Sequence, residues 1–135
     1  MINDKLKLIE KSSFYNKLDH EYIFDIYYEN NLVGDLEYRP IKNRENYYYG
    51  QIGYSIYSKY RGNKLSYYAC LKVFEIAKKE HGLKELYITC SPDNYASLHI
   101  LNKLKGELIE TVNVPKDHQL YLRNEKIKCI YRFIL

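Results

Sequence analysis

A short turn, 58–63, has the composition of an anion-binding site, because it combines Lys59, Arg61 and Gly62. Cationic side chains next to backbone N–H groups attract anions. The residues before the turn, 52–57, alternate β-branched and aromatic types as a strand does. The turn therefore follows directly on a predicted strand.

The residues after this turn predict a helix, which strengthens the anion site. From Lys64 onward, apolar residues at Leu65, Tyr68, Ala69 and Phe74 follow helical spacing. The first turn of a helix has N–H groups without intrahelical partners, and the helix dipole places about half a positive charge there. The sequence thus predicts an anion site at a strand-to-helix joint. An ordinary strand-to-helix turn is the alternative.

The segments before the turn 58–63 are predicted to form strands, and the last of these strands leads into the turn. We expect strands over 5–10, 22–29, 32–39 and 47–57, the last because a Tyr-rich run is typical of a half-covered strand. Asn30-Asn31 is expected to form a two-residue hairpin turn, since Asn tolerates positive φ.

The elements after the turn alternate between helix and strand. We expect a helix over 62–81 with its apolar stripe at Leu65, Ala69, Val73, Ile76 and Ala77, ended by Gly82. A right-handed crossover would make the next strand, 83–90, parallel to 52–57. Further along the chain we expect a helix from Tyr95 to Gly106 capped by Asn94, and closing strands over 107–114 and 120–135 joined by the turn 115–118.

Length and composition predict one domain. The 135 residues are 46% hydrophobic, enough for a single core over 1–135. The net charge of +4 is dispersed along the chain, which suits an anionic cofactor and argues against nucleic acid. Three cysteines without a CxxC pair predict neither disulfides nor a metal site. With no apolar run of membrane length, we expect a cytoplasmic protein that does not enter a membrane.

The chemistry-bearing motifs together resemble the GNAT superfamily of N-acetyltransferases. The turn reads Y-R-G-N-K-L-S, where the family has R-G-x-G-x-G/A, so Arg61 and Gly62 match and Lys64 and Ser66 depart from it. A later segment, S-P-D-N-Y-A-S, matches the family pattern N-x-x-A/S at Asn94 and Ser97. The resemblance covers the chain from Leu32 to its C-terminus.

The resemblance implies a fold and a cosubstrate. It implies an α+β fold, a GNAT-like mixed central sheet in the order ββββαβαββ, with acetyl-CoA held where two strands diverge. The N–H of Ile56 would serve as a backbone oxyanion donor, and amides from Gly62 to Tyr67 would take the diphosphate. The cofactor-binding residues are then Ser55, Ile56, Arg61, Gly62, Asn63, Lys64, Leu65, Ser66, Tyr67, Asn94 and Ser97.

Lys64 stands where the family has a glycine. We expect it to adopt ordinary right-handed helical angles, with cofactor binding weakened but retained. A decayed site that no longer binds the cofactor is the alternative.

Proton transfer needs further residues. A lysine-like amine with a pKa of ~10.4 is mostly protonated at pH 7, so direct attack on a thioester requires a base or a proton relay. Glu37 and Tyr54 are the candidates. The family usually protonates the departing thiolate with a tyrosine seven residues after the motif asparagine, where this chain has Leu101. Ser97, water or another tyrosine would have to replace it.

The segment 11–20 leaves room for at most one short helix, where the family usually has one or two. The resemblance therefore implies reduced N-terminal helices and a thin wall on the acceptor side. We expect Phe14 and Tyr15 to lie near an incompletely covered groove and a second copy of the chain to cover it as a homodimer. An open cleft that admits a protein acceptor to a monomer is the rival.

These observations favour transfer of an acetyl group from acetyl-CoA to a primary amine, by direct attack in a ternary complex. The acceptor is not encoded in any motif of the sequence. The alternative is a non-catalytic acyl-CoA-binding or interaction domain with a decayed GNAT site, for which Lys64 and Leu101 are the supporting features.

Overall fold

A computed structural model describes residues 2–15 and 20–135, and of residues 2, 3, 14 and 15 it describes the backbone alone. The first sheet has the strand order β1-β2-β3-β4 and the second the order β5-β7-β6. Every pair of neighbouring strands in both sheets is antiparallel. The strands are β1 (Leu6–Tyr15), β2 (His20–Tyr28), β3 (Asn31–Tyr38), β4 (Ile52–Ile56), β5 (Glu85–Cys90), β6 (Glu107–Asn113) and β7 (Ile127–Ile134).

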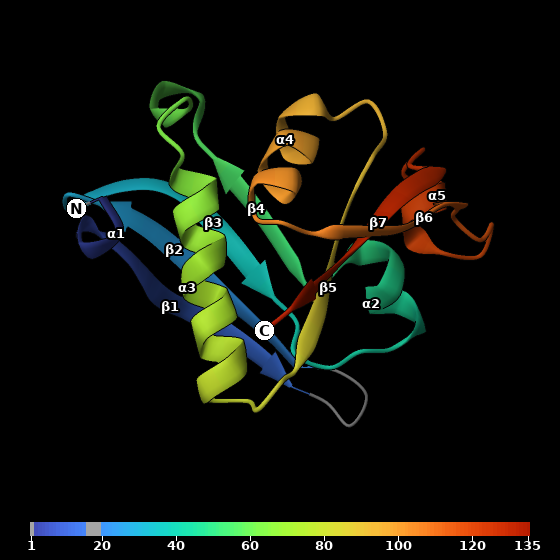
Figure 1. Ribbon diagram of the computed structural model, residues 1–135, viewed down its shortest axis with the longest axis horizontal. Coiled ribbons are helices and arrows are strands. Elements are labelled where there is room, and N and C mark those ends of the chain that lie inside the picture. Colours follow the sequence, from blue (N-terminus) through green and yellow to red (C-terminus); the bar gives the residue numbers. More distant parts are fainter. Residues whose placement is uncertain (1, 16–19) are drawn as a thin grey trace.

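Helices connect and cover these strands. The long helix α3 (Leu65–Lys79) lies across the first sheet, and α4 (Tyr95–Lys103) lies beside the upper end of β4 (Figure 1). Shorter helical segments are α1 (Ile2–Lys5), α2 (Arg44–Tyr49), the 3-10 turn η1 (Ser58–Tyr60) and α5 (Gln119–Leu122). The α+β class and the order ββββαβαββ are confirmed, with the short helices added between the predicted elements.

The core lies between α3 and the strands. On β2, β3 and β4, Ile26, Leu36 and Ile52 are almost fully buried. The predicted stripe of α3 is confirmed at four of its positions, which are buried in the same cluster: Leu65, Ala69, Val73 and Ala77. Ile76 packs against the cluster and is partly exposed. Burial of this stripe is what fixes the start of α3 against the end of β4.

The expected single mixed sheet is divided in two. The predicted parallel pairing of 52–57 with 83–90 does not form a ladder, because β4 and β5 belong to different sheets. The two edges meet at Gln51, whose N–H donates to the Tyr87 carbonyl at 2.7 Å and whose side-chain oxygen accepts the Tyr87 N–H at 2.9 Å. From this joint β4 and β5 diverge toward the end of the molecule where α3 begins (Figure 1). The divergence opens the edge of β4.

The predicted strand over 47–57 is wrong in its first part, where the chain forms α2. The Asn43 side chain caps this helix by accepting the Asn46 N–H at 2.8 Å, and Gly50 ends it with φ 83°. Two good helix ends around a six-residue segment outweigh the strand preference of Tyr47–Tyr49. The predicted strand over 120–135 likewise begins with α5, which the buried His118 caps by accepting the Leu120 N–H at 3.0 Å.

Two turns differ from expectation by small shifts. The β2–β3 hairpin turns at Glu29 and Asn30, both with positive φ, instead of at Asn30-Asn31. The helix α4 ends at Lys103, three residues before the predicted end at Gly106, and Lys105 has a positive φ of 66°. Gly106 is needed for close packing, because a Cβ there would lie 2.5 Å from the Phe133 ring.

The N-terminal region is a long hairpin. Residues 11–15, which the sequence left open for a short helix, continue β1, and the β1–β2 ladder runs to the pair Tyr15 and His20. Residues 16–19 and the side chains of Phe14 and Tyr15 lie outside the described part, so the groove contact and the homodimer based on them stay predictions. Within residues 2–15 and 20–135, no helix combines the length and apolar character that crossing a bilayer requires.

Candidate functional site

A cavity of about 690 Å³ opens between the end of β4, the turn that leads into α3, and one face of α4. It brings together ten of the eleven predicted cofactor-binding residues and Tyr54, although they come from two separate segments of the sequence, 54–67 and 94–103. The cavity is lined by Tyr54, Ser55, Ile56, Tyr60, Arg61, Gly62, Lys64, Leu65, Ser66, Tyr67, Asn94, Ala96, Ser97, His99, Ile100 and Lys103.

The edge of β4 presents free backbone groups on this side. Ile56 is the ladder partner of Gly34, and the bond flanking this pair runs from the Tyr57 N–H to the Val33 carbonyl at 2.8 Å. In an antiparallel ladder that pattern makes Ile56 and Gly34 a non-hydrogen-bonded pair, so the N–H of Ile56 points away from β3. The geometry agrees with the predicted oxyanion donor.

Arg61 holds the turn onto the end of β4. Its Nε donates to the Ile56 carbonyl at 2.9 Å, which fixes the carbonyl that follows the candidate oxyanion donor. The rest of the guanidinium remains at the cavity wall. Asn63 is the one predicted cofactor residue outside the lining, because its side chain donates to the Tyr60 carbonyl at 3.1 Å and braces the turn instead. Gly62, with φ 88°, supplies the backbone conformation that the turn requires.

The start of α3 is not capped by a side chain. Lys64 is its N-cap residue and has left-handed angles, φ 61° and ψ 21°, so the expectation of right-handed angles is wrong. Positive φ is a reason for a glycine at this position, since glycine adopts it without strain. Lys64 adopts the same left-handed backbone conformation at a cost in conformational energy. The N–H groups of the first turn of α3 face no capping side chain, as an anion site requires.

The start of α4 is capped within the chain. Asn94 accepts the Ser97 N–H at 3.2 Å, which confirms the predicted cap. The Ser97 hydroxyl in turn accepts a hydrogen bond of 3.4 Å from the Tyr54 hydroxyl across the cavity. This contact joins β4 to the first turn of α4.

Tyr54 is mostly buried in this position. Burial raises the pKa of its phenol above the ordinary value, and the neighbouring Cys70 adds to the shift. A phenol with a raised pKa keeps its proton at neutral pH. The shift therefore argues against Tyr54 as a base, which would first have to lose that proton.

Glu37 lies on the other face of the sheet. Its ladder partner is Gly53, whereas Tyr54 pairs with Leu36, and neighbouring residues of a strand point to opposite faces. The Glu37 carboxylate forms an ion pair with the Arg39 guanidinium, which also contacts Glu21 at 3.3 Å. The structure thus does not bring the two base candidates together.

One face of α4 contributes residues that the sequence analysis missed. Ala96, His99, Ile100 and Lys103 follow the spacing i, i+3, i+4, i+7, which a helical wheel drawn from Asn94 would have shown. Leu101 points away from this face and is fully buried in the core. Position 101 therefore does not line the cavity.

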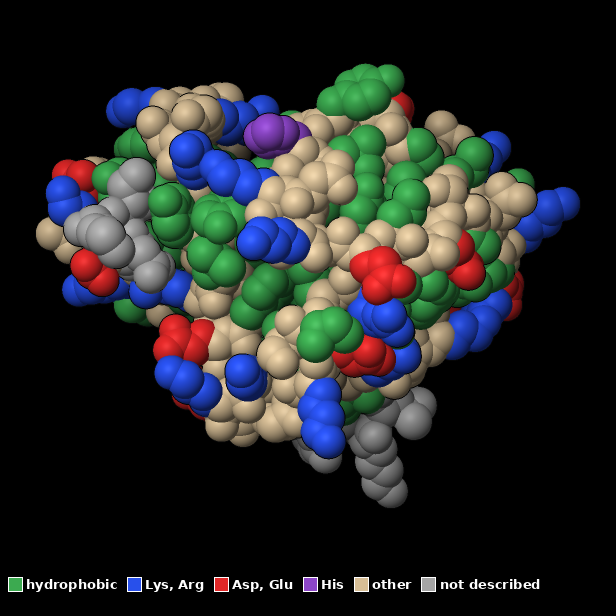
Figure 2. Space-filling view, in the orientation of Figure 1, with side chains coloured by type: hydrophobic (Ala, Val, Ile, Leu, Met, Phe, Trp, Pro, Cys, Tyr) green, Lys and Arg blue, Asp and Glu red, His purple; other side chains and the backbone are tan. Residues whose placement is uncertain are grey.

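Positive charge surrounds the cavity mouth. Lys and Arg side chains gather over the turn before α3 and the start of that helix (Figure 2). Among the cavity-lining residues, Arg61, Lys64 and Lys103 are basic. This distribution suits a ligand with several phosphates.

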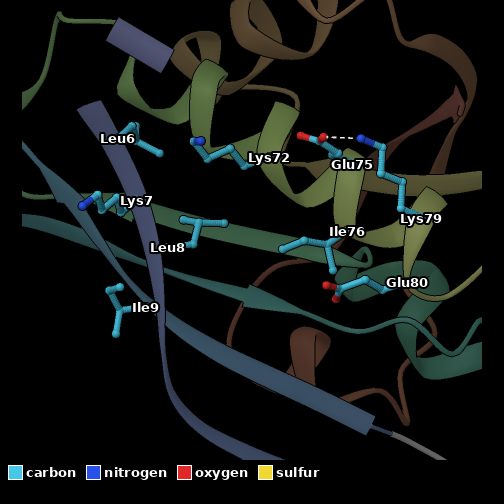
Figure 3. A pocket seen from close by; sticks show the side chains of 9 residues that line it. All are labelled: Leu6, Lys7, Leu8, Ile9, Lys72, Glu75, Ile76, Lys79 and Glu80. Carbon is cyan, nitrogen blue, oxygen red and sulfur yellow. Dashed lines mark hydrogen bonds and ion pairs between the residues drawn. The ribbon is translucent and has the colours of Figure 1, made fainter. Parts of the chain in front are cut away.

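A second hollow, of about 450 Å³, lies between β1 and α3 (Figure 3). Its walls are Leu6, Leu8 and Ile76 together with charged residues from both elements. Two of these, Glu75 and Lys79, already form an ion pair at 2.6 Å. It contains none of the predicted site residues.

The cavity lies where two strand edges diverge and is bordered by the uncapped start of α3. A family model described as an acetyltransferase (GNAT) domain matches residues 3–107, and the chain therefore belongs to the GNAT acetyltransferase family. Its sequence has no significant match among curated proteins.

Three solved structures show the same fold. A GNAT-family acetyltransferase from Bacillus anthracis has 22% identity and a TM-score of 0.65, and the match covers 83% of this chain and 65% of that one. A Salmonella typhimurium acetyltransferase that modifies the N-terminal serine of ribosomal protein L7/L12 has 17% identity and a TM-score of 0.66, covering 85% and 64%. The microcin C7 self-immunity acetyltransferase MccE, solved with acetyl-CoA and AMP, has 20% identity and a TM-score of 0.64, covering 85% and 61%. The chain thus spans less than two thirds of the length of these relatives.

Proposed function

We propose that this protein transfers the acetyl group of acetyl-CoA to a primary amine by direct attack in a ternary complex. The observation that carries the proposal is the cavity itself, with an uncapped helix start at its mouth and a protonated Tyr54 bonded to Ser97 inside it. Acetyl-CoA is the donor that family membership implies, and MccE was solved with it bound.

The anionic end of the donor fits the start of α3. The free N–H groups of Leu65, Ser66 and Tyr67 would donate to the diphosphate, and the helix dipole favours the negative charge. Arg61 adds a charge-assisted donor from the turn. The diphosphate would then lie at the mouth, where the positive charge of the surface is concentrated.

The reactive end of the donor fits the edge of β4. The Ile56 N–H, which points away from β3, would donate to the thioester oxygen as negative charge develops on it. A donor held by the strand does not need to reorient during the reaction. Arg61 contributes indirectly, by fixing the Ile56 carbonyl at 2.9 Å.

The reaction forms one bond and breaks one. The neutral amine nitrogen attacks the thioester carbon, a C–N bond forms, and the C–S bond breaks as the electron pair leaves with sulfur. Tyr54 would return a proton to that thiolate, through Ser97 or directly, because its hydroxyl lies at the cavity wall and donates to the Ser97 hydroxyl at 3.4 Å. It would take the role that the family tyrosine has at the position of Leu101.

The proton of the attacking amine must leave on the acceptor side. Glu37 is a carboxylate next to β4 on the opposite sheet face, where its Oε2 would lie 3.8 Å from a Cβ on Gly53. Its ion pair with Arg39 would have to open or be shared with the acceptor. Glu37 therefore stays a candidate base on this side of the sheet.

Two measurements test the proposal. Isothermal titration should show binding of CoA, and single-turnover assays with a panel of primary amines should show thiol release. Tyr54→Phe should lower the rate of the chemical step about a hundredfold with little change in CoA affinity, since a general acid contributes about that much. Tyr68→Phe, a half-buried tyrosine of α3 outside the cavity, is the matched control.

The same measurements distinguish the proposed transferase from the alternative, a non-catalytic domain. CoA binding without turnover on any amine would favour the non-catalytic acyl-CoA-binding domain, for which the core position of Leu101 is the specific observation. An unchanged rate in Tyr54→Phe would remove Tyr54 from the mechanism. Absence of CoA binding by the unmodified protein would overturn both functions.

A further inference from the structure

Arg39 is a buried cation directly after β3, and several contacts hold it in place. Only 11% of its side chain is exposed. Its Nη1 donates to the Gly50 carbonyl at 3.0 Å, and its Cζ lies 5.4 Å from the centre of the Tyr49 ring. Its backbone N–H donates to the Gln51 carbonyl at 2.7 Å. The guanidinium therefore has a fixed position next to the start of β4.

Two carboxylates from different strands share this guanidinium. Glu37 of β3 forms an ion pair with its Nη2, and Glu21 of β2 contacts its Nε at 3.3 Å. The two acids differ in exposure, because 45% of the Glu37 side chain is exposed and only 27% of the Glu21 side chain. Glu37 is therefore the carboxylate that an entering molecule reaches more easily, and Glu21 lies deeper.

The three side chains lie beside the strand that carries the candidate oxyanion donor. A Cβ at Gly53 of β4 would be 3.8 Å from the Glu37 Oε2 and 4.0 Å from the Arg39 Nη1. Because Gly53 has no side chain, none separates these groups from the β4 backbone at this position. Gly53 pairs with Glu37 on the sheet face opposite Tyr54. This is the face on which the proton of the attacking amine would leave.

A carboxylate paired with a buried cation is difficult to protonate when that cation has no other partner. Once Glu37 takes a proton, its charge is neutralised and Arg39 loses an ion-pair partner. A buried cation left without a counterion is strongly unfavourable. Glu21 prevents this situation, because its carboxylate stays paired with Arg39 while Glu37 is protonated. The three side chains then pass from one surplus negative charge to neutrality, instead of from neutrality to an unpaired cation.

We infer that Glu21, acting through Arg39, is a positioning residue that makes Glu37 a usable base for the acceptor amine. The inference rests on the proposed function, because it concerns the proton of the attacking amine. The ammonium group of the acceptor gives one proton to a Glu37 carboxylate oxygen, and the electron pair of that N–H bond stays on nitrogen. The neutral amine then attacks the thioester carbon. Glu21 keeps its charge throughout and does not contact the acceptor.

The inference is tested by a double-mutant cycle on the full chain, in single-turnover transfer from acetyl-CoA to the fastest amine of the panel. Glu37→Gln removes the base and should slow the chemical step about a hundredfold. Glu21→Gln should slow this step about three- to tenfold with unchanged CoA affinity, since Glu37 becomes harder to protonate. Added to Glu37→Gln, it should cause no further loss, because Glu21 acts only through Glu37.

Two further variants separate this role from a merely structural one. Glu21→Asp retains a carboxylate and should recover most of the rate that Glu21→Gln loses. Asp117→Asn is the matched control, because Arg44 also contacts two carboxylates, Glu45 at 3.1 Å and Asp117 at 3.0 Å. That guanidinium is 54% exposed, so water replaces a lost partner and the rate of transfer should not change.

The outcomes distinguish this inference from the proposed function. An unchanged rate in Glu21→Gln, or the same fold-loss when it is added to Glu37→Gln, would overturn the role of Glu21 and leave acetyl transfer intact. An unchanged rate in Glu37→Gln would remove the base through which Glu21 acts, and would overturn the inference in the same way. If the unmodified protein released no thiol with any amine, the proposed function and the inference would both be overturned.

Discussion

The starts of α3 and α4 border the same cavity and are built in opposite ways. At α4, the Asn94 side chain accepts the Ser97 N–H, so the chain satisfies its own helix end. At α3, the N-cap residue is a left-handed lysine without a capping hydrogen bond. A helix end capped by its own side chain is a structural element, whereas one left uncapped beside positive charge is prepared for an anion.

This difference assigns separate roles to the two family motifs. Asn94, which the motif places near the donor, is engaged in capping, so we expect it to affect ligand binding only through the position of Ser97. At the start of α3, by contrast, the N-cap residue Lys64 forms no side-chain capping hydrogen bond, although the Tyr60 and Arg61 N–H groups of the preceding turn donate to the Tyr57 and Ser58 carbonyls. Substitutions at the start of α4 should therefore change mainly the free energy of unfolding, and substitutions at the start of α3 mainly the affinity for CoA.

The largest effect is expected for Arg61→Ala, which removes the charged side chain that borders the uncapped end. One charge-assisted bond to phosphate contributes ~1.5–3 kcal/mol, so the dissociation constant for CoA should rise roughly ten- to a hundredfold. Titration calorimetry measures it. Lys59→Ala is the control, because Lys59 lies in the same turn outside the cavity, with its Nζ 5.5 Å from the centre of the Tyr60 ring. An equal loss of CoA affinity in Arg61→Ala and Lys59→Ala would show that binding depends on the net charge of the turn and not on a specific contact of Arg61.

A smaller effect is expected when the capped end is broken. Asn94→Ala should lower the free energy of unfolding by about 1 kcal/mol, the usual cost of losing an N-cap, which corresponds to roughly 3–5 °C in melting temperature for a domain of this size. Thermal unfolding followed by circular dichroism measures it. Asn94→Ser retains a capping oxygen and should restore most of the stability. A serine variant that is stable but binds CoA weakly would show that Asn94 contacts the ligand directly.

The smallest effect is expected from relieving the strain at the uncapped end. Lys64→Gly introduces at this position a residue that adopts φ 61° without strain. The free energy of unfolding of the ligand-free protein should therefore increase by about 0.5–1 kcal/mol. CoA affinity should fall in the same variant, because the ammonium is lost. Thermal unfolding with and without CoA measures both quantities. An increase in affinity would mean that Lys64 obstructs the site and that the comparison of the two helix starts is wrong.

Local signals in the sequence determined much of this protein. The order of the strands and long helices, the apolar stripe of α3, the Asn94 cap and the motif of Arg61 and Gly62 are all short-range patterns. Each depends on residues within a few positions of one another, so the sequence carries it directly. The same kind of signal was present at Asn43 and Gly50, where two helix ends were hidden by the strand preference of three tyrosines.

The tertiary structure alone decided how these parts meet. The two sheets meet at the Gln51–Tyr87 joint, which links residues 36 positions apart. The opposite placement of Glu37 and Tyr54, the burial of Leu101 and the convergence of α3 and α4 on one cavity depend on how whole elements pack. Such contacts follow from the summed burial of many side chains and not from the pattern of any one segment, so sequence spacing could propose the site residues but not which of them face one another.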